Sequence, residues 1–126
     1  MKKILFLFAV LMFFSCKKES QESFGKPDAT TEVQTPAALG KTIFEGKGAC
    51  IACHKSDVKL VGPSLQDIAK IYKEKNGNMV HFLKGDGKPL VDPTQYEVMK
   101  PNLVLTKTFS DEELKALEAY VYSNLK

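Results

Sequence analysis

Cys50-Ile51-Ala52-Cys53-His54 is the stretch of the 126-residue sequence that decides how the chain folds. Two cysteines stand three positions apart, and a histidine directly follows the second. This order of residues is typical of a covalent c-type haem site. The two thiols can add to the two vinyl groups of one haem, because the two-residue spacer lets one helical turn present both sulfurs to one edge of the ring. His54 then lies beneath the iron as an axial ligand.

Two other interpretations of this stretch remain as alternatives. A thioredoxin-like redox pair would sit in a strand–helix–strand pattern, and the residues on either side show no strand-like run. A zinc site needs about four ligands. Apart from Cys16, the chain offers only Cys50, Cys53, His54 and the distant His81. Cys53 and His54 are adjacent, which makes their joint coordination of one metal awkward, so haem attachment is favoured.

The composition predicts one globular domain without a nucleic-acid partner. Hydrophobic residues make up 44% of the chain and charged residues 26%, which is ordinary for a globular protein. The formal net charge is only +3. Every basic residue is a lysine, so the sequence has no arginine guanidinium group that could bind a phosphate through bidentate hydrogen bonds.

The N-terminal residues have the pattern of an export signal. Lys2 and Lys3 precede an unbroken apolar run over residues 4–14. This run is too short to span a bilayer, which takes about 20 residues, and it suits the apolar core of a signal peptide. We therefore expect residues 1–15 to be a signal peptide of the lipoprotein type.

Cys16 is the predicted site of lipid attachment. Phe13-Phe14-Ser15-Cys16 resembles the lipobox of bacterial lipoproteins, in which the cysteine becomes the lipidated N-terminus. A stray signal-peptide cysteine and an uncleaved anchor are the alternatives. With lipid on Cys16 and haem on Cys50 and Cys53, no cysteine is left for a disulfide. We expect an exported protein on the periplasmic side, anchored by lipid to a bacterial membrane.

A polar segment separates this cysteine from the predicted domain. Residues 16–36 contain few large apolar side chains and cannot bury enough surface to fold alone. We expect a flexible tether there, with an unordered terminus that has no role as the alternative. Residues 37–126 then form a single haem domain.

Helical periodicity recurs through that domain, and no segment alternates as a strand would. Apolar residues follow helical spacing around residues 39–44, 64–72, 79–83 and 110–125. Ser64 is a candidate N-cap, and Ser110 with Glu113 forms a capping box at the start of the last segment. We predict an all-α fold of four to five short helices packed around one covalent haem, whose apolar body supplements a thin core.

The second axial ligand decides what the haem can do. Met79 and His81 lie in a short apolar helix, where a core role is the ordinary interpretation. Met99 lies in a polar stretch that we expect to be a loop, stiffened by Pro101 and running to Leu105. Met99 is therefore the predicted iron ligand. Met79, His81 and an open sixth position remain as alternatives.

Taken in order along the chain, these motifs resemble a small bacterial class I cytochrome c. The resemblance covers residues 39–125 and rests on four stretches: Cys50-x-x-Cys53-His54, Gly62-Pro63-Ser64-Leu65, Met99-Lys100-Pro101 and Leu117-x-x-Tyr120-Val121. It implies that the Pro63 carbonyl bonds the outer ring nitrogen of His54. It also implies that the first and last helices cross through a glycine and aromatic residues, which match Gly40, Phe44, Leu117 and Tyr120.

The stretch over residues 76–95 has no matching motif, and we expect it to shape the rim of the haem crevice. Tyr72, Tyr96 and Asn102 are candidates to bond a propionate or the methionine sulfur, with plain solvation as the alternative.

The expected function is single-electron transfer by a monomeric carrier that is not an enzyme. Its partners would be redox proteins that dock at the exposed haem edge, near the membrane that holds the lipid. Two alternatives remain. One is a haem subunit of a larger oxidase or dehydrogenase, and the other is a gas sensor or peroxidase with a displaceable sixth ligand.

Overall fold

The computed structural model describes residues 34–126, which form an all-α domain. This part of the chain contains five α-helices and two short 3₁₀ helices and no strand, so the predicted fold class is confirmed. No helix within it is long and apolar enough to cross a membrane. The predicted signal peptide, the lipid site at Cys16 and most of the predicted tether lie outside the described residues.

The first helix, α1 (Pro36–Glu45), begins one residue before the predicted start of the domain. The Thr35 side chain caps it by accepting a hydrogen bond from the Ala38 backbone N–H at 3.2 Å. Pro36 stands in the first turn, where a missing N–H costs no helical bond. The helix buries Gly40, Ile43 and Phe44, as the periodicity predicts.

The last helix, α5 (Asp111–Tyr122), starts at the predicted capping box. Glu113 N–H donates to the Ser110 hydroxyl at 3.2 Å, and Ser110 N–H donates to the Glu113 carboxylate at 3.0 Å. The three acidic residues of its first turn face the positive end of the helix dipole.

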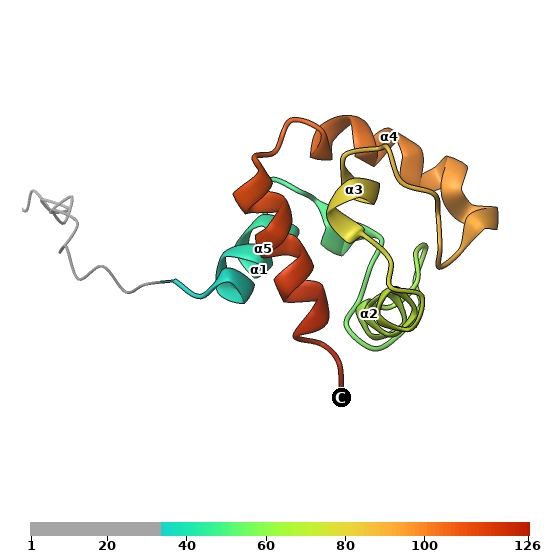
Figure 1. The fold of residues 1–126 in the computed structure, drawn as a ribbon, viewed down its shortest axis with the longest axis horizontal. Coiled ribbons are helices and arrows are strands. Elements are labelled where there is room, and N and C mark those ends of the chain that lie inside the picture. Colours follow the sequence, from blue (N-terminus) through green and yellow to red (C-terminus); the bar gives the residue numbers. More distant parts are fainter. Residues whose placement is uncertain (1–33) are drawn as a thin grey trace, which may run out of the picture. The chain divides into compact units, whose positions relative to one another are not determined.

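These two helices cross in close contact (Figure 1). A Cβ atom built on Gly40 would lie only 2.5 Å from the backbone carbonyl carbon of Ala116 and 2.8 Å from Tyr120 Cβ. The rings of Phe44 and Tyr120 meet beside this point, with centroids 5.3 Å apart and planes tilted by 60°. Gly40 is therefore required for the close approach of the backbones.

Two helices follow the cysteine motif. In α2 (Leu65–Glu74), the Ser64 hydroxyl accepts from the Asp67 N–H at 3.1 Å, which confirms the predicted N-cap. The five-residue α3 (Met79–Leu83) is capped by Asn78. Apolar residues from α1, α2, α3, α5 and the loop just before α5 share one core: Ile43, Phe44, Leu65, Ala69, Tyr72, Met79, Phe109, Leu114, Ala116, Leu117 and Val121.

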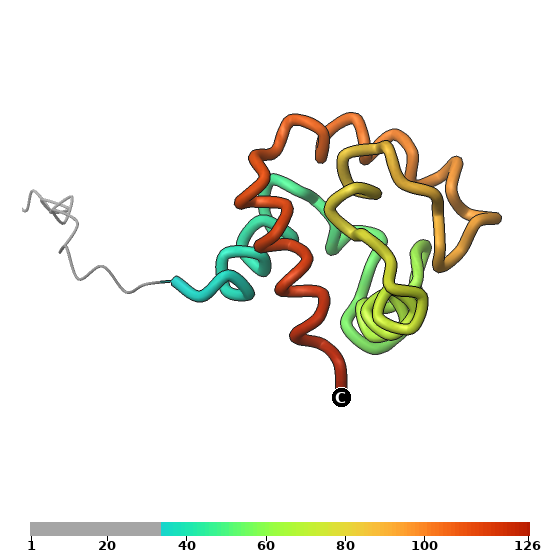
Figure 2. The backbone as a smooth tube through the Cα atoms, in the orientation of Figure 1, coloured from blue at the N-terminus to red at the C-terminus, as the bar shows by residue number. Residues whose placement is uncertain are grey.

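The predicted loop up to Leu105 is wrong. A 3₁₀ turn (Pro93–Gln95) leads directly into α4 (Tyr96–Thr106), an eleven-residue helix with Pro101 inside it. Proline removes one backbone donor there, but buried Leu103 and Thr106 still hold the helix to the domain. Figure 2 shows the chain running outward after α3 and returning along α4.

Candidate haem site

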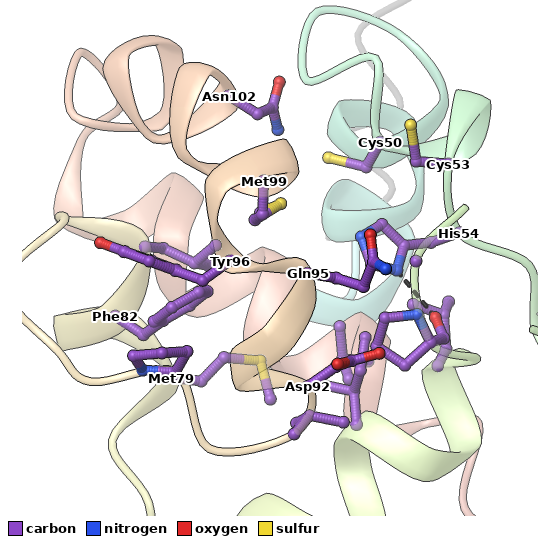
Figure 3. A pocket seen from close by; sticks show the side chains of 18 of the residues that line it. Cys50, Cys53, His54, Met79, Phe82, Asp92, Gln95, Tyr96, Met99 and Asn102 are labelled. Carbon is purple, nitrogen blue, oxygen red and sulfur yellow. Dashed lines mark hydrogen bonds between the residues drawn. The ribbon is translucent and has the colours of Figure 1, made fainter. Parts of the chain in front are cut away.

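A crevice opens between the residues that follow α1 and the helix α4. Its cavity volume is about 200 Å³. Cys50, Cys53 and His54 lie on one wall, and Met99 and Asn102 lie on the other (Figure 3). His54 and Met99, which are 45 positions apart in sequence, thus face the same crevice.

A tight 3₁₀ turn (Cys50–Ala52) presents the two cysteines. Cys53 N–H and His54 N–H both donate to the Cys50 carbonyl, at 3.1 and 3.0 Å. Ala49 enters the turn in the left-handed region, with φ of 50°. Both cysteines are free and half-buried, and burial raises the pKa of the Cys50 thiol. One turn of backbone therefore brings both sulfurs to the same side of the crevice.

The imidazole of His54 is held in one orientation. Its Nδ1 atom lies 2.8 Å from the Pro63 carbonyl oxygen. Because a carbonyl can only accept a hydrogen bond, Nδ1 carries the proton and Nε2 keeps its lone pair free to bind a metal.

Gly62 packs against the ring of His54, a contact that the Cys-x-x-Cys-His motif alone did not reveal. A Cβ there would lie 2.8 Å from His54 Nδ1 and 2.9 Å from Nε2, so only glycine lets the ring lie flat against the backbone. The sequence signal for this contact is the position of Gly62 directly before Pro63.

The three candidates for the second iron ligand lie in different surroundings. Met99 is half-buried on α4, and its thioether points into the crevice (Figure 3). Met79 also touches the crevice, but it is 3% exposed and belongs to the core. His81 is exposed and is not among the residues that line the crevice.

Tyr72, Tyr96 and Asn102 all line the crevice. Burial raises the pKa of Tyr72 well above its usual range, so this phenol stays protonated. No hydrogen bond from Tyr96 or Asn102 to the methionine sulfur is found among the described residues.

The stretch over residues 76–95 shapes the crevice, and Asp92 stands at the end opposite Asn102 (Figure 3). Hydrogen bonds from Thr94 and Lys59 lower the pKa of Asp92, so its carboxylate is charged at neutral pH. Sequence reasoning missed Asp92, because a lone aspartate before a proline carries no signal beyond a turn.

The residues present fit a covalently held haem. Two thiols stand together at one wall, while an imidazole nitrogen and a thioether face the same space from opposite sides. Val61 and Val98 line the rim and are 47% and 57% exposed, leaving apolar surface for a large flat group to cover. Within residues 34–126, no three histidine, cysteine or acidic side chains gather as a metal site, which is what the zinc alternative requires.

Comparison with known proteins agrees with this geometry. The family model described as cytochrome c matches residues 37–124. Cytochrome c-551 of Pseudomonas denitrificans is 34% identical over 91 residues, covering 67% of this chain and 95% of the relative. Cytochrome c-551 of Pseudomonas aeruginosa is 31% identical over 86 residues, covering 66% and 74%. Cytochrome c-552 of Nitrosomonas europaea is 36% identical over 76 residues, covering 60% and 69%.

The all-α fold, the paired cysteines with their histidine, the crevice and these relatives lead to one conclusion. The chain belongs to the cytochrome c family, as a class I monohaem cytochrome that carries haem c and transfers electrons rather than acting as an enzyme.

Proposed function

We propose that this cytochrome binds its haem iron through His54 and Met99 and carries single electrons at a membrane surface outside the cytoplasm. Cys50 and Cys53 form the two thioether links, and lipid on Cys16 holds the protein at that surface. The observation that carries the proposal is the crevice, which His54 and Met99 line from opposite walls.

Haem supplies the exchange of one electron at its iron when it is bound. The chain's own residues decide how that exchange runs. The Pro63 carbonyl holds the His54 ring by its Nδ1 proton, which fixes the direction of Nε2 and makes it a stronger donor. A thioether on the opposite side favours the reduced iron, because methionine is a soft and neutral ligand.

Two ligands from the protein also leave no position for a substrate. Buried Leu65 and Leu117 line the crevice and would keep water from the cofactor. A closed and dry site limits rearrangement during electron transfer, and this favours a carrier over a gas sensor or a peroxidase.

The remaining residues fit an anchored carrier of three parts. We propose a signal peptide over residues 1–15, a lipid-bearing tether over 16–36 and the haem domain over 37–126. Support comes from the apolar run that ends at Ser15-Cys16 and from the polar composition that follows. An anchor would confine the search for redox partners to a membrane surface and raise their effective concentration.

The ligand assignment is tested by the spectrum of the ferric protein. We expect a low-spin form with a methionine-to-iron charge-transfer band, which Met99→Ala abolishes. Met79→Leu is the matched control, because it keeps the volume of a core methionine and removes its sulfur. Loss of the band in Met79→Leu, or rapid carbon monoxide binding by the ferrous wild type, would contradict the assignment.

The anchor is tested separately by Cys16→Ser in the full chain. We expect a labelled fatty acid to become attached to the wild type and not to the variant, both with haem attached. A wild type that takes up no label, or a variant that takes up as much label as the wild type, would refute lipid anchoring through Cys16.

A further inference from the structure

Lys59 lies in the loop that follows the predicted iron ligand His54. Its backbone forms an isolated antiparallel bridge with His54. Two further backbone bonds close the same loop, from Gly62 N–H to the Cys53 carbonyl at 2.9 Å and from Leu60 N–H to the Gly62 carbonyl at 3.0 Å. The position of Lys59 is therefore tied to that of the predicted iron ligand His54.

Asp92 lines the crevice from the segment that leads into α4. It is the N-cap residue of the 3₁₀ turn that leads without a break into α4, the helix that carries Met99. The Thr94 hydroxyl donates to Asp92 Oδ1 at 2.6 Å, and the Gln95 N–H donates to the Asp92 carbonyl at 3.2 Å. The carboxylate of Asp92 is thus fixed in place at the start of the helix.

Lys59 Nζ donates to Asp92 Oδ2 at 2.9 Å, and this bond joins the loop after His54 to the segment that leads into α4. We propose that the Lys59–Asp92 ion pair is a clasp across the crevice that holds the N-terminal half of α4 over the haem. Both are positioning residues, since neither touches the iron. The inference rests on the proposed function, in which Met99 binds the iron.

The other ion pairs of the described domain do not make this connection. Lys41–Glu45 and Lys100–Glu97 lie within single helices, while Lys47–Glu113 and Lys84–Asp111 join other segments to the start of α5. At its far end, α4 is already fixed by the buried Thr106 hydroxyl, which donates to the Leu83 carbonyl at 2.6 Å. Met99 lies between these two attachments.

Exposed ion pairs usually contribute little, because ordering two long side chains costs entropy. Here the cost is small on one side, since Asp92 is already held by Thr94 and its side chain is only 19% exposed. Lys59 is 60% exposed at its side chain, but its backbone is fixed by the bridge to His54. We therefore expect the pair to reach the upper range for exposed ion pairs.

A broken clasp frees the first turns of α4, so an outside ligand displaces Met99 more easily. The measurement is imidazole binding to the ferric protein, followed by loss of the methionine-to-iron band. We expect Asp92→Asn and Lys59→Gln each to bind imidazole about threefold to fivefold tighter than the wild type, the factor that corresponds to the upper range for exposed ion pairs. Asparagine at 92 keeps an acceptor for Thr94 and removes the charge.

The double variant separates a clasp from two independent effects. We expect it to bind imidazole no more tightly than either single variant, because the same interaction is already lost. We also expect the difference from the wild type to shrink at high salt, because ions weaken a salt bridge whose lysine is 60% exposed. Asp111→Asn is the matched control, since it breaks an ion pair away from the crevice and leaves imidazole affinity unchanged.

Three results would overturn the clasp: single variants with wild-type affinity, additive effects in the double variant, or an equal effect of Asp111→Asn. A wild-type protein without the methionine-to-iron band is a different failure, because it removes the ligand assignment itself. The two proposals are thus distinguished within one set of spectra.

Discussion

Gly40→Ala adds a single methyl group at the crossing of α1 and α5. In an exposed helix this change would stabilise the chain by about 1 kcal/mol, because alanine is the better helix former. Here the new Cβ would stand 2.5 Å from the Ala116 carbonyl carbon and 2.8 Å from Tyr120 Cβ. Since the first of these is backbone, no side chain can rotate away, and the two helices must move apart.

Forced separation of packed elements costs about 3 kcal/mol at the upper end of its usual range. After the gain in helix propensity, a net loss of about 2 kcal/mol remains. For a domain of this size each 1 kcal/mol shifts Tm by about 4–8 °C, so we expect Tm to fall by about 8–16 °C. The assay is thermal unfolding of the haem-loaded protein, followed by circular dichroism and by haem absorbance.

Lys41 supplies the matched control, because it is exposed at the next position of the same helix. Comparison of Lys41→Ala with Lys41→Gly measures the preference of α1 for alanine over glycine without any collision. We expect the alanine variant to be more stable by about 1 kcal/mol. A Gly40→Ala protein that melts at or above the wild-type temperature would refute the close packing of α1 on α5.

Three further changes test other parts of the fold. Glu113→Gln removes a carboxylate whose pKa is lowered below its usual value of 4.5, chiefly by its hydrogen bond with Lys47. This carboxylate stabilises the folded protein at pH values above its unfolded-state pKa, and the stabilisation is lost as the pH falls through its folded-state pKa. Urea unfolding should therefore give the wild type a larger free energy of unfolding than the variant at pH 7 and an equal one near pH 2. A difference that does not change with pH would show that the Glu113 charge is not its cause. Cys50→Ala/Cys53→Ala yields a haem-free chain that we expect to be largely unfolded, and a cooperative thermal transition in it would show that the core suffices alone. Ser64→Ala removes the cap of α2 and should cost about 1 kcal/mol in thermal unfolding, whereas an unchanged Tm would contradict the capping role.

Helix starts could be predicted from sequence because their signals are local. Ser64 and Ser110 each stand directly before an amphipathic run, and a cap bonds an amide only three residues away. The burial of Ile43 and Phe44 follows from helical spacing in the same way. Such features need no knowledge of the rest of the chain.

Helix α4 could not be predicted by the same reasoning. The polar stretch around Pro101 favours a stiffened loop, although a proline removes only one backbone donor and a buried residue further along can hold the helix. That residue is Thr106, whose hydroxyl bonds a carbonyl 23 positions earlier. The Lys59–Asp92 pair was missed for a related reason, since its partners are 33 positions apart and meet only after two loops have folded.

The packing of α1 against α5 imposes an order on how this protein is made. A chain that emerges N-terminus first leaves the apolar face of α1 uncovered until α5 has been synthesised. Contacts between such distant segments also close late, because a long loop must be ordered first. The segment proposed to bind haem, residues 50–54, is complete long before that point. Haem attachment can thus precede the arrival of α5, whereas the final folding around the cofactor cannot.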